Sequence, residues 1–127
     1  MTKRRIDAEA LERVKILFCD DETLILLGVA RILGRICGEI KTASKGEEAL
    51  SFFLSDKPDL LITDLVMPGM DGWTLVERIR EHDTSTPIIT LSAHDEDVRK
   101  AEGSDLHIRK PVTKEELTEA IRAFMHP

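Results

Sequence analysis

Short apolar runs alternate with helical stretches along this chain, and this alternation constrains the fold more than any other feature of the sequence. Runs that suit strands occupy residues 14–19, 39–43, 59–64, 88–91 and 106–108. Apolar residues at helical spacing mark residues 23–36, 44–54, 73–80 and 113–124. Strands separated by helices in this way are joined by right-handed crossovers into one parallel sheet. The sequence therefore predicts an α/β fold with a doubly wound, five-stranded sheet and helices on both faces.

Two of the predicted helices begin with capping-box sequences. Ser44 is followed three residues later by Glu47, and Thr113 is followed by Glu116. At 127 residues the chain is long enough for one domain with a continuous core. We assign residues 14–127 to this domain and the polar residues 1–13 to an N-terminal extension, whose basic cluster at residues 3–5 is most simply a solvated end.

Composition excludes several classes of function and location. The net charge of −6 argues against nucleic-acid binding by this domain, because phosphate contacts need a basic surface. No apolar run approaches the roughly 20 residues that span a membrane, and no signal peptide follows the basic N-terminus. Cys19 and Cys37 have neither metal-binding nor disulfide spacing. We therefore expect a cytoplasmic protein with reduced thiols and no membrane partner.

Polar side chains follow the predicted strands at one end of the sheet. Asp20 and Asp21 follow the first strand, Asp64 ends the third, Ser92 ends the fourth, and Lys110 follows the fifth. Ligand sites of open α/β sheets lie at this edge. Carboxylates placed together repel one another, and Mg²⁺, which prefers hard oxygen ligands, removes that conflict. A lysine and a hydroxyl beside the cation would complete a site for a phosphoryl group.

Each of these residues also has a simpler interpretation. Asp20 and Asp21 suit the N-terminus of the following helix. Asp64 could merely end a strand, Ser92 could be a turn residue, and Lys110 could be a solvated lysine. What favours a site is that all of them fall at strand ends of the same edge and have compatible chemistry.

These residues closely resemble the motifs of the receiver domain of two-component response regulators. The resemblance covers roughly Val14 to Met125, nearly the whole chain, and implies a flavodoxin-like sheet of five strands. The residues that carry it are Phe18-Cys19-Asp20-Asp21-Glu22, the stretch from Asp59 to Gly72, Ser92-Ala93 and Lys110-Pro111.

The resemblance implies a phosphoacceptor and a Mg²⁺ site. Asp64 would be the nucleophile that forms an acyl phosphate. Asp20 and Asp21 would hold Mg²⁺ together with Asp64, and the backbone carbonyl of Val66 would add a ligand.

The resemblance also implies residues that respond to the phosphoryl group. Ser92 would donate to the phosphoryl oxygens and move inward on activation. Lys110 would pair with the phosphoryl group, or with Asp64 before phosphorylation. A cis peptide bond is implied between Lys110 and Pro111, although few X-Pro bonds are cis in general.

Two features depart from the family pattern. His107 stands three residues before Lys110, at a position that is often Tyr or Phe in the family. This histidine could act as a smaller switch residue, introduce pH sensitivity, or be a partly exposed strand histidine. Only 18 positions separate Ser92 from Lys110, about one helical turn fewer than usual. The fourth helix, expected within residues 95–102, should therefore be short, displaced or unformed.

The favoured function is a phosphorylation-dependent signalling switch. Its phosphoryl donor would be a histidine kinase or a phosphotransfer protein, and its output would be a change of affinity for a downstream protein or an output domain. Intrinsic autophosphatase activity would act as a timer and not as a metabolic enzyme. An aspartate-dependent phosphatase is disfavoured, because its second acid would stand where this chain has Val66. A degenerate receiver that binds partners without phosphorylation is the main alternative, and a homodimer stays open.

Overall fold

The five predicted strands form one parallel sheet in a computed structural model that describes residues 11–93 and 101–125. The strand order is β2-β1-β3-β4-β5, and every neighbouring pair is parallel. All residues of β3 and β4 are buried, as in strands covered on both faces. The strands are β1 (Lys15–Cys19), β2 (Glu39–Ala43), β3 (Leu60–Asp64), β4 (Ile88–Ser92) and β5 (Leu106–Arg109). This is the flavodoxin-like order, which confirms the predicted fold.

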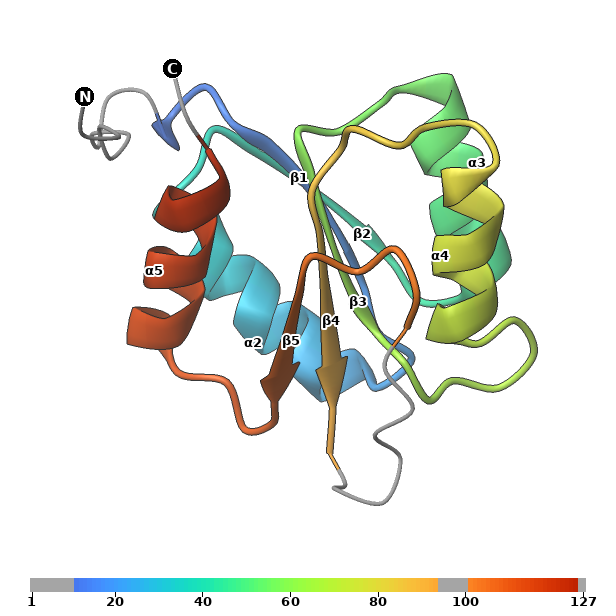
Figure 1. Ribbon diagram of the computed structural model, residues 1–127. Helices are drawn as coiled ribbons and strands as arrows, with labels where there is room; N and C mark the ends of the chain where they lie inside the picture. Colours follow the sequence, from blue (N-terminus) through green and yellow to red (C-terminus); the bar gives the residue numbers. More distant parts are fainter. Residues whose placement is uncertain (1–10, 94–100, 126–127) are drawn as a thin grey trace.

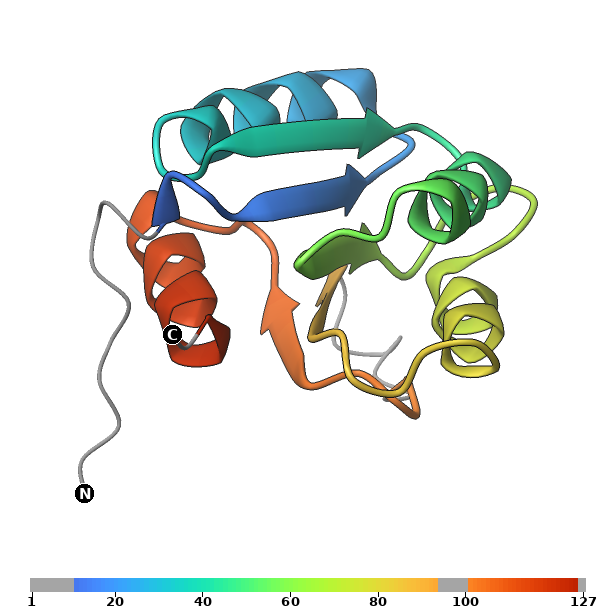
Figure 2. The same cartoon turned by 90° about the horizontal axis from the view of Figure 1, so that it is seen from above.

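The described helices cover both faces of the sheet. They are α2 (Thr23–Gly34), α3 (Gly46–Ser55), α4 (Gly72–Arg80) and α5 (Lys114–Phe124). Figures 1 and 2 show α2 and α5 on one face and α3 and α4 on the other. None of them is both long and apolar enough to cross a membrane.

Two apolar clusters follow from this arrangement, one on each face of the sheet. Alternate strand residues point to opposite faces, so Ile16 and Phe18 of β1 pack towards α2 and α5, whereas Leu17 and Cys19 pack towards α3 and α4. Leu11, which lies in the expected N-terminal extension, is 1% exposed and belongs to the α2/α5 cluster.

One of the two predicted capping boxes is confirmed. At α5, Thr113 accepts a hydrogen bond from the Glu116 amide at 3.0 Å, and the Glu116 carboxylate accepts one from the Thr113 amide. The box predicted at Ser44 is wrong. The N-cap of α3 is Lys45, which makes no side-chain cap, and Glu48 instead of Glu47 accepts from the Ser44 amide, at 2.9 Å.

The region between β4 and β5 tests the expected fourth helix only in part. That helix was expected within residues 95–102, most of which lie outside the described residues. Residues 101–105 form a turn, in which the Ser104 amide donates to the Ala101 carbonyl at 3.1 Å and Gly103 has a φ of 92°. Arg80 at the end of α4 holds this turn by donating from Nη2 to the Gly103 carbonyl at 2.7 Å.

Candidate functional site

Three carboxylates gather at the carboxyl edge of the sheet. β1 and β3 are neighbours, so the residues that end them lie side by side. Asp20, Asp21 and Asp64 each offer a carboxylate oxygen, and these oxygens lie within 4.8 Å of one another. Asp20 is fully buried, and Asp64 is only 5% exposed. The structure thus brings together the three acids that the sequence placed at this edge.

Lys110 reaches this cluster from the segment after β5. Its Nζ lies 2.7 Å from Asp20 Oδ2 and 3.3 Å from Asp64 Oδ2. Its amide donates to the Ser92 carbonyl at 2.8 Å, and its peptide bond to Pro111 is cis, the form that the resemblance implied. One ammonium group is therefore shared by two carboxylates.

The charges of the site are not balanced. Burial raises the pKa of Asp64 to about 6; the charges of Asp20 and Asp21 add to this, and Lys110 opposes it. Burial works against a charged Lys110, yet the hydrogen bond to Asp20 and the charge of Asp64 raise the pKa of its ammonium group. Three close acids share one lysine, so the site has an excess of negative charge that a divalent cation would neutralise. Carboxylate oxygens suit Mg²⁺. The donor set thus fits the ion expected from the sequence.

The loop between β3 and α4, residues 65–71, is held close to the end of β3. The Gly72 amide donates to the Leu65 carbonyl at 2.8 Å, and a Cβ at Gly72 would overlap the Asp64 carbonyl oxygen. Glycine at this position therefore lets α4 begin against the end of β3. Val66 lies in this loop with its side chain 51% exposed, and the use of its carbonyl as a ligand stays a prediction.

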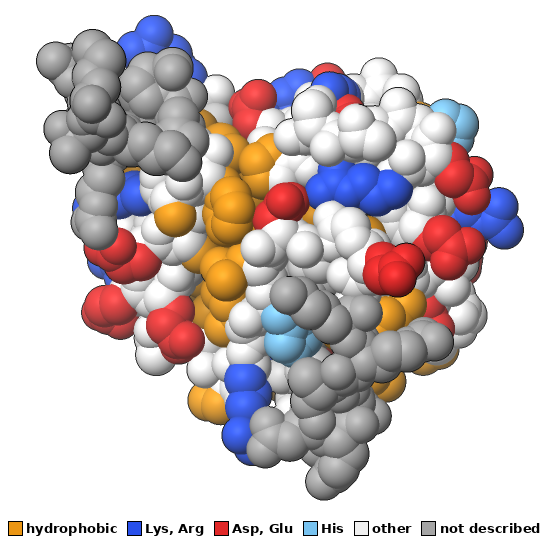
Figure 3. Space-filling model, in the orientation of Figure 1, with side chains coloured by type: hydrophobic (Ala, Val, Ile, Leu, Met, Phe, Trp, Pro, Cys, Tyr) orange, Lys and Arg blue, Asp and Glu red, His pale blue; other side chains and the backbone are white. Residues whose placement is uncertain are grey.

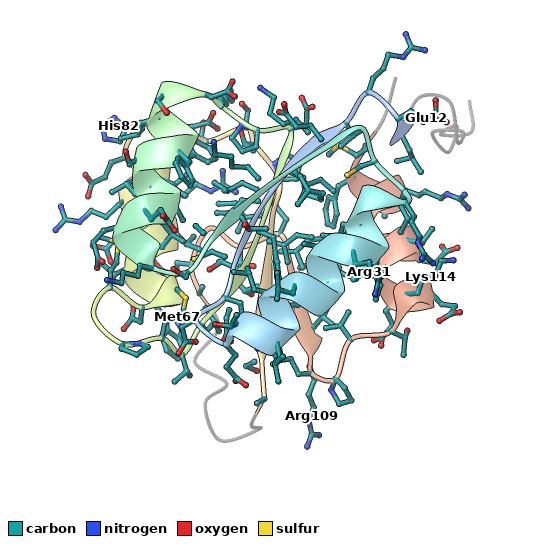
Figure 4. All side chains as sticks on the ribbon, turned by 180° about the vertical axis from the view of Figure 1, so that it is seen from behind. Glu12, Arg31, Met67, His82, Arg109 and Lys114 are labelled. Atoms are coloured by element: carbon teal, nitrogen blue, oxygen red, sulfur yellow. The ribbon has the colours of Figure 1, made fainter. Side chains whose placement is uncertain are left out.

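Glu47 and Met67 anchor the same loop. Glu47 of α3 accepts a hydrogen bond from the Met70 amide at 2.9 Å, and the Met67 sulfur lies 3.7 Å from Cys19 Sγ. Figure 4 shows Met67 at the end of the sheet where α2 begins. No sequence pattern predicts the loop contact of Glu47, because its partner lies 23 positions away and the capping pattern pairs Glu47 with the nearer Ser44.

Ser92 and His107 lie side by side at the end of β4 and on β5. Ser92 is 2% exposed, and its Oγ lies 2.9 Å from His107 Nε2. The other ring nitrogen, Nδ1, lies 2.9 Å from Thr90 Oγ1. Thr90 is a second residue that the sequence did not single out, because only the pairing of Thr90 with His107 across two strands reveals it.

An apolar groove of about 560 Å³ adjoins the site. It runs along α2 and is lined on its helix side mainly by Ile25, Val29 and Ile32, and Lys110 also lines it. The neighbouring surface of α2 exposes Leu24 and Leu27, which are 86% and 62% exposed. An apolar surface therefore lies directly beside the charged site.

A flavodoxin-like sheet whose carboxyl edge carries three acids, a hydroxyl and a lysine defines the class of two-component signalling domains that the sequence motifs resemble. The family model "Response regulator receiver domain" matches residues 16–122. The chain belongs to this family.

Several relatives with curated names are named as transcriptional regulators. The chain is 35% identical over 119 residues to the positive alginate biosynthesis regulatory protein of Pseudomonas aeruginosa, covering 90% of this chain and 48% of that protein. It is 34% identical over 115 residues to the alkaline phosphatase synthesis transcriptional regulatory protein PhoP of Bacillus subtilis, covering 87% and 48%. The chain thus spans about half the length of these relatives.

Solved structures show the same fold. The response regulator TrrA of Thermotoga maritima, in complex with Mg²⁺-BeF, superposes with a TM-score of 0.82 at 32% identity, over 88% of this chain and 99% of that one. The chemotaxis response regulator CheY4 of Vibrio cholerae gives a TM-score of 0.82 at 29% identity, over 89% and 99%.

Proposed function

We propose that this domain is a Mg²⁺-dependent phosphorylation switch that accepts a phosphoryl group on Asp64. The observation that carries the proposal is the Asp64 carboxylate, buried among two further acids and 3.3 Å from the Lys110 ammonium. Receiver domains are signalling phosphoacceptors, and every residue that the family motif requires for this role is present at the edge of the sheet.

The chemistry is the transfer of one phosphoryl group to a carboxylate. An Asp64 oxygen attacks the phosphorus, an O–P bond forms, and the bond from phosphorus to the donor nitrogen or oxygen breaks. A histidine nitrogen takes up a proton from solvent as it leaves, whereas a small acyl phosphate leaves its carboxylate as the anion. Lys110 and the Ser92 hydroxyl would stabilise the negative charge on the phosphoryl oxygens. Slow hydrolysis of the acyl phosphate would return the switch to its resting state.

The cation would be held by the carboxylates of Asp20, Asp21 and Asp64 and by the carbonyl of Val66. When bound, Mg²⁺ would neutralise charge on the phosphoryl oxygens and on the acids. Asp20 is already oriented for this, because its Oδ1 accepts a hydrogen bond from the Glu22 amide at 3.0 Å.

The phosphoryl donor would be a histidine kinase or a phosphotransfer protein that docks on α2. The exposed Leu24 and Leu27 and the apolar groove lie beside Lys110, so a helix seated there would bring its phosphohistidine close to Asp64. The far end of this face is basic. Arg31 and Arg35 of α2 and Lys114 of α5 line one small pocket, and Figure 4 shows Arg31 and Lys114 close together. We therefore infer a partner helix with an apolar stripe and acidic residues at one end.

The output would be a change in affinity for a downstream protein or an output domain in the cytoplasm. Figure 3 shows a strip of hydrophobic side chains beside α5, on the face of the molecule that carries β5. β5 also carries His107, which contacts the phosphoryl-binding Ser92. A partner or a second copy of this domain that binds there would sense the state of the site. No nucleic-acid contact is proposed, in keeping with the net charge of −6.

The alternative function is a partner-binding module that ignores phosphorylation. The observation that favours it is that both phosphoryl-binding groups already have partners, Ser92 with His107 and Lys110 with two acids.

Intact mass after incubation with acetyl phosphate and Mg²⁺ tests the proposal. We expect the mass of one added phosphoryl group, lost with EDTA and lost in Asp64→Asn. Glu77→Gln, which removes an exposed acid on α4 outside the site, is the matched control and should be phosphorylated like the wild type. If neither acetyl phosphate nor the purified kinase adds a phosphoryl group, the switch is wrong and the binding module takes its place.

A further inference from the structure

A chain of hydrogen-bonding side chains links the phosphoryl site to the turn that precedes β5. Ser92 Oγ contacts His107 Nε2 at 2.9 Å, and His107 Nδ1 contacts Thr90 Oγ1 at 2.9 Å. Thr90 Oγ1 in turn lies 3.0 Å from Ser104 Oγ, which donates to the Leu106 carbonyl at 3.0 Å. The imidazole is the central member, and both of its nitrogens are engaged.

The buried Ser92 hydroxyl sets the direction of the hydrogen bonds to His107. Thr90 Oγ1 can donate either to Ser104 Oγ at 3.0 Å or to the Leu106 carbonyl at 3.5 Å, so it is able to accept from Nδ1 of His107. Nε2 is then an acceptor, and the buried Ser92 hydroxyl donates to it. Among the residues that the structure describes, Nε2 is the one acceptor within hydrogen-bond distance of this hydroxyl. A buried hydroxyl that donates to nothing costs free energy, so the resting domain should carry the His107 proton on Nδ1.

A phosphoryl group on Asp64 would reverse this direction. A phosphoryl oxygen is an acceptor only, so Ser92 must turn its proton from Nε2 towards the phosphoryl group. Ser92 Oγ can then keep its contact with the ring only if Nε2 carries a proton. Thr90, which has a free choice of acceptor, then donates to the unprotonated Nδ1. His107 is half-buried, so water can take the Nδ1 proton and supply one to Nε2, and the ring loses and gains one proton.

We propose that His107 is a positioning residue for Ser92, which reports phosphorylation by moving its proton from Nδ1 to Nε2. The ring keeps its place between β4 and β5, because turning it would break two hydrogen bonds at once. In the phosphorylated domain the Nε2 proton holds Ser92 Oγ in the orientation that donates to the phosphoryl oxygen. This inference rests on the proposed function of Asp64 and adds the regulation of its site.

Nitrogen NMR of ¹⁵N-histidine-labelled protein tests the proposal, with Mg²⁺ and beryllofluoride as a stable phosphoryl mimic. We expect the Nε2 signal of His107 to move from the unprotonated to the protonated range as the mimic binds, and Nδ1 to move the opposite way. Fluorine NMR reports separately whether the mimic is bound. No bound mimic would overturn both this inference and the phosphoacceptor proposal. A bound mimic with an unchanged His107 tautomer would overturn this inference alone.

Three substitutions separate positioning from packing. The amide of His107→Gln reaches Ser92 as Nε2 does, whereas His107→Asn reaches only towards Thr90, and His107→Phe fills the space without polar atoms. We expect His107→Asn and His107→Phe to weaken beryllofluoride binding on the order of fivefold, the worth of one ordinary hydrogen bond, and His107→Gln to restore it. Equal affinity in all three variants would contradict a positioning role.

Discussion

Burial and the neighbouring acids raise the pKa of Asp64. Its pKa of about 6 means that the folded chain binds this proton more tightly than the unfolded chain does, where the pKa is 3.8. The unphosphorylated, metal-free site is therefore a source of instability at neutral pH. This is the reverse of an ordinary salt-bridged aspartate, whose charge stabilises the fold.

Asp64→Asn should therefore stabilise the metal-free domain at neutral pH. Stability due to the raised pKa is complete below about pH 4 and is lost as the pH rises through 6, so the advantage of the variant should grow over that range. We expect a gain in the free energy of unfolding of about 1 to 2 kcal/mol at pH 7, and none at pH 4. Urea unfolding in EDTA measures it, with Glu77→Gln as the control. A variant less stable than the wild type at pH 7 would show that the carboxylate is stabilising.

At the scale of single residues, the sequence predicts what lies at strand ends but not what reaches across strands. Asp20, Asp64 and Lys110 follow from where apolar runs stop, and the edge of a parallel sheet brings such positions together. Thr90 and Glu47 act through partners 17 and 23 positions away, and no local pattern points to those partners.

Among the elements, α2 stands out because it is apolar on more sides than the sheet needs. Of its residues only Leu33 is fully buried, although leucine, isoleucine and valine make up much of the helix. A surface helix normally keeps one apolar stripe towards the core. The extra leucines therefore favour a partner that covers this helix.

The substitutions Leu24→Glu and Leu27→Glu should slow phosphorylation by the protein donor but not phosphorylation by a small molecule. A charge placed in an apolar interface is costly, so we expect phosphorylation by the cognate kinase to slow by roughly tenfold or more. The rate with acetyl phosphate should stay as in the wild type. The control is Leu54→Glu, which places the same charge on α3 at another exposed leucine, 52% exposed. Equal slowing of both reactions would place the effect in the site and not at a docking surface.

The start of a helix could be predicted from local residues only where no distant residue competes for the capping groups. The α5 capping box formed as expected because only local residues compete for its groups. The predicted box at Ser44 did not form, because Gly46 packs against Met70 and the loop takes Glu47 for itself. Tertiary contact thus shifted the start of α3, and it did so at the loop that carries the site.

For the whole molecule, cation binding and folding should be coupled. The three acids lie at the ends of β1 and β3 and approach within 4.8 Å only when the sheet is formed, so Mg²⁺ should bind the folded chain and not the unfolded one. We expect the melting temperature to rise with Mg²⁺ concentration. The free energy of unfolding should increase by about 2.7 kcal/mol when the Mg²⁺ concentration is about 100 times its Kd. Calorimetry of the wild type and Asp21→Asn measures this, because the variant should lose most of the gain. K⁺ at equal ionic strength is the control, and an equal effect of K⁺ would contradict a specific site.

The fold as a whole could be predicted because alternation of strands and helices leaves few topologies. The strand order itself came from the family resemblance, since periodicity does not say which strands are neighbours. The expected fourth helix within residues 95–102 stays a prediction for the part outside the described residues.

The two edges of the sheet decide how this domain can be recognised. β2 and β5 have one neighbour each, yet both are short, and β2 carries Glu39 and Lys41 while β5 carries Arg109. Such charged, short edges discourage the addition of a foreign strand. Partners are then left to distinguish this domain by the side chains on its helices and loops. A few side-chain substitutions can therefore change which partner such a domain binds. The backbone that holds the acidic site need not change.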